Sequence, residues 1–443
     1  MSDSLSPPTD PTLVARSRVL RGGALVAAAL AAGNLLGYAF NLVASRALSP
    51  AGFGEVGALL GLVLIGNVAA LGLQAVAARH VALVLARATR DTSTNRPRAQ
   101  LKRLSAGTAL GVGVLIVLAS PALAWFLHLD SVAPVLLVSA ALVSLIHLGT
   151  LLGLLQGEER MTALALLYLT AALGKVGGGL LGLALQPTVT AALAGTATGS
   201  LLAVVVGEML IRRSDDVRPS GAGLRGLAHL PRELAHASGA LLALFLLTNL
   251  DLLAARHWLS APEAGRYALG AVIAKGCFWL PQFVSVVAFP WLARTDRRAS
   301  TLRAAAVVVV TLGVTAVTLV ALAPSTIVRL VGGEAYEPLA PAAWMFAAAG
   351  STFALAHLLL MARLAASDSR AVAAVWVVVA IEIAAFSLFH GSVGQVAGSV
   401  LAAAVTLCCI GAVAEAHDRR RRLLPVAAKD QSDGIAADHG ASR

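Results

Sequence analysis

Four charged residues stand inside long apolar stretches of this chain, where an ionised group is costly. They are Lys175, Asp251, Lys275 and Glu382. At the centre of a membrane helix each costs roughly 2.5–3.5 kcal/mol on insertion scales, so we expect each to face protein rather than lipid. A carboxylate in such a place can bind a proton or a sodium ion, and an ammonium can bind an anion or pair with a carboxylate.

Asp251 and Lys275 lie in two consecutive apolar runs joined by a short turn at Ser260–Gly265. At 1.5 Å per residue they lie roughly 10 and 15 Å below the outer ends of adjacent helices, so an ion pair is possible. Two interpretations stay open. The pair is either structural, or it is a working site that breaks during transport or contacts a substrate.

The other charged positions also have alternatives. Lys175 precedes Gly177–Gly179, where helix backbones can approach closely, and its alternative is to extend its ammonium to the outer interface. Glu382 either binds a coupling ion, as Asp251 could, or pairs with a neighbouring helix. We interpret His147 as a packed core residue rather than a proton relay.

Uncharged polar residues recur at helical spacing in the same runs. Positions three, four or seven apart share one helix face, and the sets are Asn34, Tyr38, Asn41 and Ser45; Asn67 and Gln74; and Lys275 and Gln282. Polar stripes on three helices predict a shared polar interior, because amides facing lipid would be costly. The alternative is hydrogen bonding between helices without contact with cargo.

The composition excludes a water-soluble globular protein. Of 443 residues, 58% are hydrophobic and 13% are charged, and the mean hydropathy is +0.81, whereas soluble domains carry about a quarter charged residues. We interpret the net charge of +11 as a membrane-topology signal rather than a nucleic-acid footprint. The three cysteines lie inside apolar runs, so they predict neither disulfides nor a metal site.

Motifs of catalysis are missing from the sequence. It contains no H-E-x-x-H, P-loop or G-x-S-x-G motif. We therefore expect no enzyme activity, no catalytic residue, no cofactor and no metal. Gly52, Gly54 and Gly57 do form G-x-G-x-x-G, but membrane helices flank it, so we interpret these glycines as permitting a tight turn and close helix packing.

The apolar runs define the predicted fold class. A bilayer core needs about 20 apolar residues per helix, and twelve runs are long enough: 23–45, 56–78, 104–127, 132–156, 162–184, 188–211, 237–258, 265–291, 302–323, 339–361, 370–389 and 392–414. We predict an all-α polytopic membrane protein. Most of its 34 lysines and arginines fall on one side of these helices, which places both termini in the cytoplasm.

The chain divides into two halves of six predicted helices. We expect a cytoplasmic N-tail at 1–22, a bundle at 23–211, a cytoplasmic linker at 212–236, a second bundle at 237–414 and a basic, disordered cytoplasmic tail at 415–443. A shift of 211 positions aligns Leu48-Ser49 with Leu259-Ser260 and Gly54 with Gly265. This parallel repeat predicts two bundles around a central cavity.

The two turns also carry a family resemblance. The first reads Arg46-Ala47-Leu48-Ser49-Pro50-Ala51-Gly52-Phe53-Gly54, and the second is surrounded by Asn249, Leu250, Asp251, Leu259-Ser260, Glu263-Ala264-Gly265, Tyr267 and Pro290. With these motifs the chain resembles the polysaccharide and oligosaccharide flippases of the multidrug/oligosaccharidyl-lipid/polysaccharide exporter superfamily.

The resemblance implies a function and a site. Helices one, two, seven and eight would face the cavity, and alternating access would move an undecaprenyl-diphosphate-linked glycan to the outer leaflet of a bacterial plasma membrane. Membrane lipids, a glycan polymerase and glycosyltransferases are the implied partners. Arg46, Lys175 and Lys275 would be the cations available to the diphosphate. The complete set of cavity candidates is Asn34, Tyr38, Asn41, Arg46, Asn67, Gln74, Lys175, Asp251, Lys275 and Gln282.

Two alternatives stay open. The multidrug branch of the superfamily relies on acids in its cavities, so a cation-coupled exporter of small molecules, with Asp251 or Glu382 binding the coupling ion, is the second hypothesis. A non-transporting membrane scaffold for a glycan-synthesis complex is the third, and a dry cavity filled by side chains would favour it.

Overall fold

The chain is helical throughout the part that the structure describes. The computed structural model describes residues 11–87, 95–212, 239, 241–279, 281, 298–365 and 370–440, and no strand occurs in these ranges. Eleven helices in them are long and apolar enough to cross a membrane. The predicted all-α class is therefore confirmed. The predicted eighth helix, 265–291, continues into residues outside these ranges, so the count of twelve and the cytoplasmic termini stay predictions.

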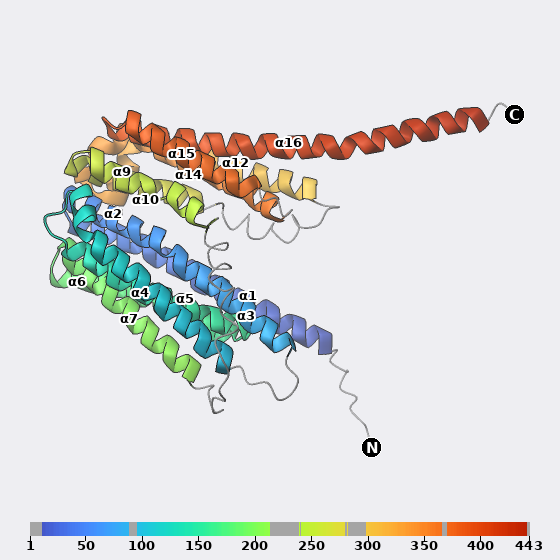
Figure 1. Cartoon of the computed structure of the whole chain (residues 1–443). Coiled ribbons are helices and arrows are strands. Elements are labelled where there is room, and N and C mark those ends of the chain that lie inside the picture. Colours follow the sequence, from blue (N-terminus) through green and yellow to red (C-terminus); the bar gives the residue numbers. More distant parts are fainter. Residues whose placement is uncertain are drawn as a thin grey trace, which may run out of the picture. The chain divides into compact units, whose positions relative to one another are not determined.

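The described residues form two compact units, one up to Ala268 and one from Leu269 onward. The helices of the first unit (Figure 1) are α1 (Pro11–Ala47), α2 (Pro50–Gly66), α3 (Val68–Arg87), α4 (Asn95–Phe126), α5 (Ala133–Gly157), α6 (Met161–Leu185), α7 (Val189–Arg212) and α9 (Leu250–Trp258). The division falls inside α10 (Ala261–Trp279).

The second unit holds the remaining helices. They are α12 (Arg298–Leu322), α13 (Pro324–Gly332), the 3-10 helix η2 (Glu334–Ala342), α14 (Ala343–Ala365), α15 (Arg370–Leu388) and α16 (Val393–Gly440). Within this unit α14 packs against α12 and α16, and α15 packs against α16. The last helix continues well past the predicted end of the twelfth span at 414, whereas the predicted disorder of the tail stays a prediction.

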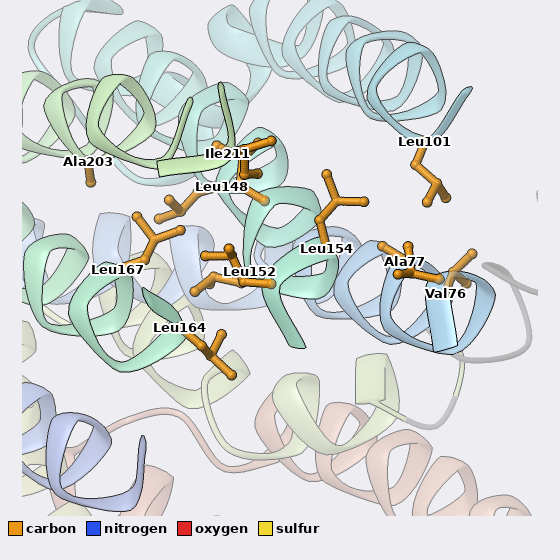
Figure 2. Packing of buried hydrophobic residues seen from close by; sticks show 13 residues of the cluster. Val76, Ala77, Leu101, Leu148, Leu152, Leu154, Leu164, Leu167, Ala203 and Ile211 are labelled. Atoms are coloured by element: carbon orange, nitrogen blue, oxygen red, sulfur yellow. The ribbon is translucent and has the colours of Figure 1, made fainter. Parts of the chain in front are cut away.

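Leucine-rich packing forms the core of the first unit. Figure 2 shows apolar side chains from α3, α4, α5, α6 and α7 that make one cluster. Leu101, Leu151, Leu154 and Leu155 in this cluster are completely buried. Because lipid is as apolar as leucine, such packing acts through van der Waals contacts rather than through removal of apolar surface from water.

Small residues bring α6 close to both of its neighbours. Toward α7 the contacts are antiparallel and pair Gly174 with Gly199, Gly178 with Gly195, and Gly182 with Ala191, each between main chains. Helices α6 and α1 run parallel. Their contacts keep one constant sequence offset, at Gly22 with Met161, Gly33 with Ala172 and Phe40 with Gly179. Close backbone approach at small residues is the usual packing mode of membrane helices. This confirms the close approach that we predicted around Gly177–Gly179.

The predicted second membrane helix is interrupted by one residue. Asn67 separates α2 from α3, and its N–H donates to the carbonyl of Val63 at 2.8 Å. The preceding residue is Gly66, and Gly and Asn both have low helix propensity, which explains an interruption here. The helical hydrogen bonds continue across it, since the N–H of Leu71 donates to the carbonyl of Asn67 at 3.1 Å. The predicted span at 56–78 lies within Pro50–Ala86, which qualifies as a single membrane span.

Candidate functional site

The polar wall of the first unit is built on the face of α6 that contacts α1. Ala172 of α6 meets Gly33 of α1, where an added Cβ would lie 3.2 Å from that of Ala172, and Gly179 meets Phe40. Lys175 is three residues after Ala172 and four before Gly179, so it lies on the same helical stripe. The constant offset between α1 and α6 puts it level with the part of α1 between Asn34 and Tyr38.

Lys175 is half-buried near the middle of α6. It is 14 residues from Met161 and 10 from Leu185, which is about 21 and 15 Å along the helix. Within the described parts of the chain, no hydrogen bond or ion pair joins it to another residue. An ammonium at this depth without a protein partner is a candidate binding group for an anion.

The polar residues predicted on one face of α1 lie at the same height along this helix pair as Lys175. Asn34 is exposed, and Tyr38 and Asn41 are half-buried. Asn41 donates its amide hydrogen to the carbonyl of Gly37 at 2.8 Å. This bond stays within α1, so it does not serve the interhelical bonding that was the alternative interpretation, and the Asn41 carbonyl oxygen can still accept.

Gln74 lies in a small cluster that the sequence did not reveal. Its amide donates to Oε1 of Gln156 at 2.9 Å and to the hydroxyl of Tyr168 at 2.6 Å. Tyr168 is seven residues before Lys175 on α6 and shares its stripe. That spacing is a signal from which Tyr168 could have been predicted. The wall therefore combines an ammonium with amide and phenol groups over about 10 Å.

Two further cavity candidates have local structural contacts. Arg46 is exposed and donates from Nη1 to the carbonyl of Leu42 at 2.8 Å. Asn67 forms the interruption between α2 and α3. Neither is joined to Lys175 by a described contact, and Gln282 lies outside the described residues.

Asp251 has a partner that the sequence argument did not identify. The hydroxyl of Tyr267 donates to Oδ2 of Asp251 at 2.9 Å, in a buried site between α9 and α10. Tyr267 is 1% exposed and Asp251 is 8% exposed. Lys275 belongs to the second unit, so the proposed Asp251–Lys275 pair stays a prediction. Glu382, the other candidate for a coupling ion, is completely buried on α15.

We expect Tyr267→Phe to lower the free energy of unfolding by about 1.5–3 kcal/mol, because it removes a hydrogen bond to an ionised group in a buried place. Thermal unfolding in detergent would measure this loss. Tyr168→Phe, which removes a hydroxyl bonded only to neutral groups, is the matched control and should cost about 0.5–1.5 kcal/mol. Equal losses in the two variants would contradict a charged Asp251.

The two repeated turns pack directly against each other. A Cβ added to Gly54 would lie 2.6 Å from the main-chain nitrogen of Gly265, and one added to Gly57 would lie 3.0 Å from the Cβ of Ala268. This confirms that these glycines serve close packing. The turns are capped differently: Ser49 accepts from the N–H of Gly52, whereas Ser260 donates to Glu263 at 2.6 Å through its hydroxyl.

Hydrogen bonds join the C-terminal end of α9 to the residues at the C-terminal end of α4. Arg256 donates to the carbonyls of Leu127 and His128 at 2.9 and 3.1 Å. His257 lies 2.8 Å from the carbonyl of Phe126 and stacks on its ring at 4.0 Å. Three carbonyls left over at a helix terminus are thus satisfied from another helix. Together with the packed turns, these contacts join the end of α9 and the start of α10 to α4 and α2 of the first repeat.

A second polar network lies toward the other end of the unit. Oγ of Ser105 is 3.3 Å from Nδ1 of His147, and Nε2 of His147 is 2.9 Å from Oε1 of Glu208. Lys102 contacts the same carboxylate at 2.7 Å. A serine, a histidine and a carboxylate also form hydrolytic triads, but Ser105 is completely buried within a membrane span, so no substrate can reach its oxygen. His147 is part of this hydrogen-bonded network, and its interpretation as a packed core residue rather than a proton relay stays a prediction.

Metal ligands do not gather in the described residues: they contain no group of three or more His, Cys, Asp or Glu side chains arranged to hold a metal ion. The candidate site is therefore the polar wall, defined by Asn34, Tyr38, Asn41, Gln74, Gln156, Tyr168 and Lys175. Its chemistry is one positive charge beside neutral hydrogen-bonding groups.

Comparisons with known proteins give the same architecture. A family profile described as "Polysaccharide biosynthesis protein" matches residues 19–296. No protein of curated function matches the sequence significantly. Among solved structures, an inward-facing multidrug resistance MATE family transporter of the MOP superfamily has a TM-score of 0.70 at 12% identity, covering 88% of this chain and 96% of that one.

Two other solved structures show the same fold. The lipid II flippase MurJ, in an inward closed conformation, has a TM-score of 0.71 at 12% identity, covering 88% of this chain and 87% of that one. A mutant of the Vibrio cholerae MATE transporter VcmN has a TM-score of 0.58 at 14% identity, with 92% and 98% covered. The predicted superfamily resemblance is confirmed, and the fold is that of MOP superfamily transporters.

Proposed function

The chain belongs to the polysaccharide biosynthesis protein family, and we propose that it flips a lipid-linked oligosaccharide or polysaccharide precursor across the bacterial plasma membrane by alternating access. The observation that carries this proposal is Lys175, an intramembrane ammonium without a partner among the described residues, on a wall of amides and phenols. Both termini are proposed to be cytoplasmic, with the two bundles at 23–211 and 237–414 moving around a central cavity.

The wall suits the two chemical parts of such a cargo. The diphosphate of an undecaprenyl-diphosphate-linked glycan is anionic and would be attracted by Lys175, with Arg46 and Lys275 as further candidates. Sugar hydroxyls both donate and accept hydrogen bonds, as do Gln74, Gln156 and Tyr168. MurJ, which shares this fold, is described as a lipid II flippase, which supports a lipid cargo.

In the proposed transport cycle, cargo competes for the lysine of an ion pair, and the cavity then closes on one side of the membrane. When the cavity is empty, Asp251 and Lys275 would pair. An incoming anionic head group would compete for the lysine, and closure of one bundle face would then expose the other. Because only binding that differs between the two states can shift their populations, the cargo must bind the two states unequally. A glycan polymerase and glycosyltransferases are the proposed neighbours that use and supply the cargo.

The proposal is tested in proteoliposomes that contain a fluorescent polyprenyl-diphosphate oligosaccharide. We expect Lys175→Met to slow flipping about ten- to a hundredfold, since a hydrogen bond to a charged group contributes about 1.5–3 kcal/mol. We also expect its melting temperature to stay equal or rise, because a costly intramembrane charge is removed.

Lys102→Met is the matched control. Lys102 is bound to Glu208 at 2.7 Å, so this variant should lower the melting temperature, while the binding wall stays intact. Full flipping by the Lys175→Met variant would contradict the role of Lys175. Absence of flipping by the unaltered protein, with active MurJ in parallel, would contradict the proposed function itself.

A second candidate function is export of small molecules coupled to a cation. Its support is the buried carboxylate of Asp251 and the fold shared with multidrug resistance MATE transporters. Drug efflux that depends on pH or sodium and that is abolished by Asp251→Asn would establish this alternative. Efflux unaffected by the substitution would exclude Asp251 as the coupling site.

A further inference from the structure

A pocket of about 170 Å³ lies in the second unit between α14, α15 and α16. Ten residues line it, of which eight are alanine, leucine, isoleucine or glycine and the other two are Arg363 and His417. None of the ten is acidic. The pocket is formed entirely within the second unit, and it contains no residue of the polar wall in the first unit.

The polarity of this pocket changes along the helices. On α14 the lining extends from Ala356 to Arg363, about 10 Å, and on α16 from Leu407 to His417, about 15 Å. In both helices the cationic residue is the last lining residue toward the C-terminus, which on α14 is the end nearest to α15 in sequence. The other end is apolar. The pocket is therefore amphipathic in the direction in which a membrane lipid is amphipathic.

The volume restricts what can occupy the pocket. Sites for drug-sized ligands measure about 300–1,000 Å³, so 170 Å³ is too small for a sugar diphosphate or a glycan. A single hydrocarbon segment fits the apolar part, with a phosphate at the two cations. Basic side chains at a membrane surface attract anionic head groups rather than zwitterionic ones.

We propose that this pocket binds an anionic phospholipid of the surrounding membrane, with its phosphate at Arg363 and His417 and one acyl chain extending toward Ala356 and Leu407. In the proposed orientation this lipid belongs to the cytoplasmic leaflet. It is a resident of the second unit and not the cargo, so the site goes beyond the proposed flipping function.

The test uses the purified full chain in nanodiscs of phosphatidylcholine with added phosphatidylglycerol, and counts retained lipids by native mass spectrometry. No cargo is present, so the result is independent of the proposed function. We expect phosphatidylglycerol to be retained over phosphatidylcholine. Ala374→Trp, which fills the pocket, should abolish the preference, and Arg363→Gln should weaken retention about fivefold.

Two matched controls separate this site from general effects. Ala373→Trp puts the same side chain on an exposed neighbour that does not line the pocket, and Arg303→Gln removes an exposed arginine of α12. Both should retain the lipid as the unaltered protein does, with melting temperatures that show folded protein. Equal retention of the two lipids, or unchanged retention by Ala374→Trp, would overturn the proposal. Displacement of phosphatidylglycerol by a polyprenyl diphosphate would overturn it too, because the pocket would then hold the tail of the cargo.

Discussion

Replacing Glu158 by alanine is expected to lower the free energy of unfolding by about 3–5 kcal/mol, because the change removes a carboxylate that contacts a buried arginine. Glu158 contacts Arg98 at 2.7 Å, and their side chains are only 7% and 9% exposed. Arg160 lies 3.6 Å from the same carboxylate. Chemical or thermal unfolding in detergent would measure the loss.

The second unit offers a matched comparison for this ion pair. Arg329 and Glu337 are also 2.7 Å apart, but their side chains are 51% and 46% exposed. The hydrogen bond to Glu337 raises the pKa of Arg329, yet an exposed pair contributes little to stability. Glu337→Ala should therefore change the melting temperature slightly or not at all. Similar losses in the two variants would show that burial does not decide the strength of these pairs.

The other large effect is expected from Gly265→Ala. A Cβ at this position would collide with the main-chain carbonyl of Pro50, and a main-chain atom cannot rotate away as a side chain can. Overpacking of this kind costs about 1–3 kcal/mol. The variant should therefore be less stable, and if the two turns must stay packed during flipping, it should also flip more slowly in the liposome assay.

Gly52→Ala provides the contrast for that variant. It lies in the other turn, where an added Cβ would be 3.6 Å from its nearest neighbours, an ordinary contact. Since alanine is favoured over glycine in a helix by about 1 kcal/mol, Gly52→Ala should leave stability equal or raise it. A loss in Gly52→Ala as large as in Gly265→Ala would mean that main-chain packing between the turns is not the cause.

Hydropathy was sufficient to predict the eleven membrane helices of the described residues, because a lipid environment requires long apolar segments that satisfy their own backbone hydrogen bonds. It did not predict the interruption at Asn67, since one polar residue between two apolar segments changes the mean hydropathy very little. Gly54 and Gly265 could be aligned from sequence. Their direct contact could not be predicted, because a repeat specifies similar local structure and not the distance between its copies.

The polar site was predictable only in part. Lys175 and Gln74 were found because polar residues are rare in apolar runs. Tyr168 and Tyr267 were missed, because an aromatic ring is common in membrane helices and its hydroxyl becomes informative only once a partner is known. The bond from Tyr267 therefore adds a partner to Asp251 that the sequence did not indicate, and the Asp251–Lys275 pair stays a prediction.

The contacts between α6 and α7 have a mechanical consequence for any transport cycle. Three main-chain contacts, at Gly174, Gly178 and Gly182, engage at successive turns of one seam. Sliding or rotation of one helix against the other would drive carbonyl groups into the opposite backbone at all three levels simultaneously. Helices α6 and α7 must therefore move together as one rigid unit, and Lys175 moves with them and keeps its position along α7. Any change of helix angle during a transport cycle then occurs at helix contacts that are less tightly packed.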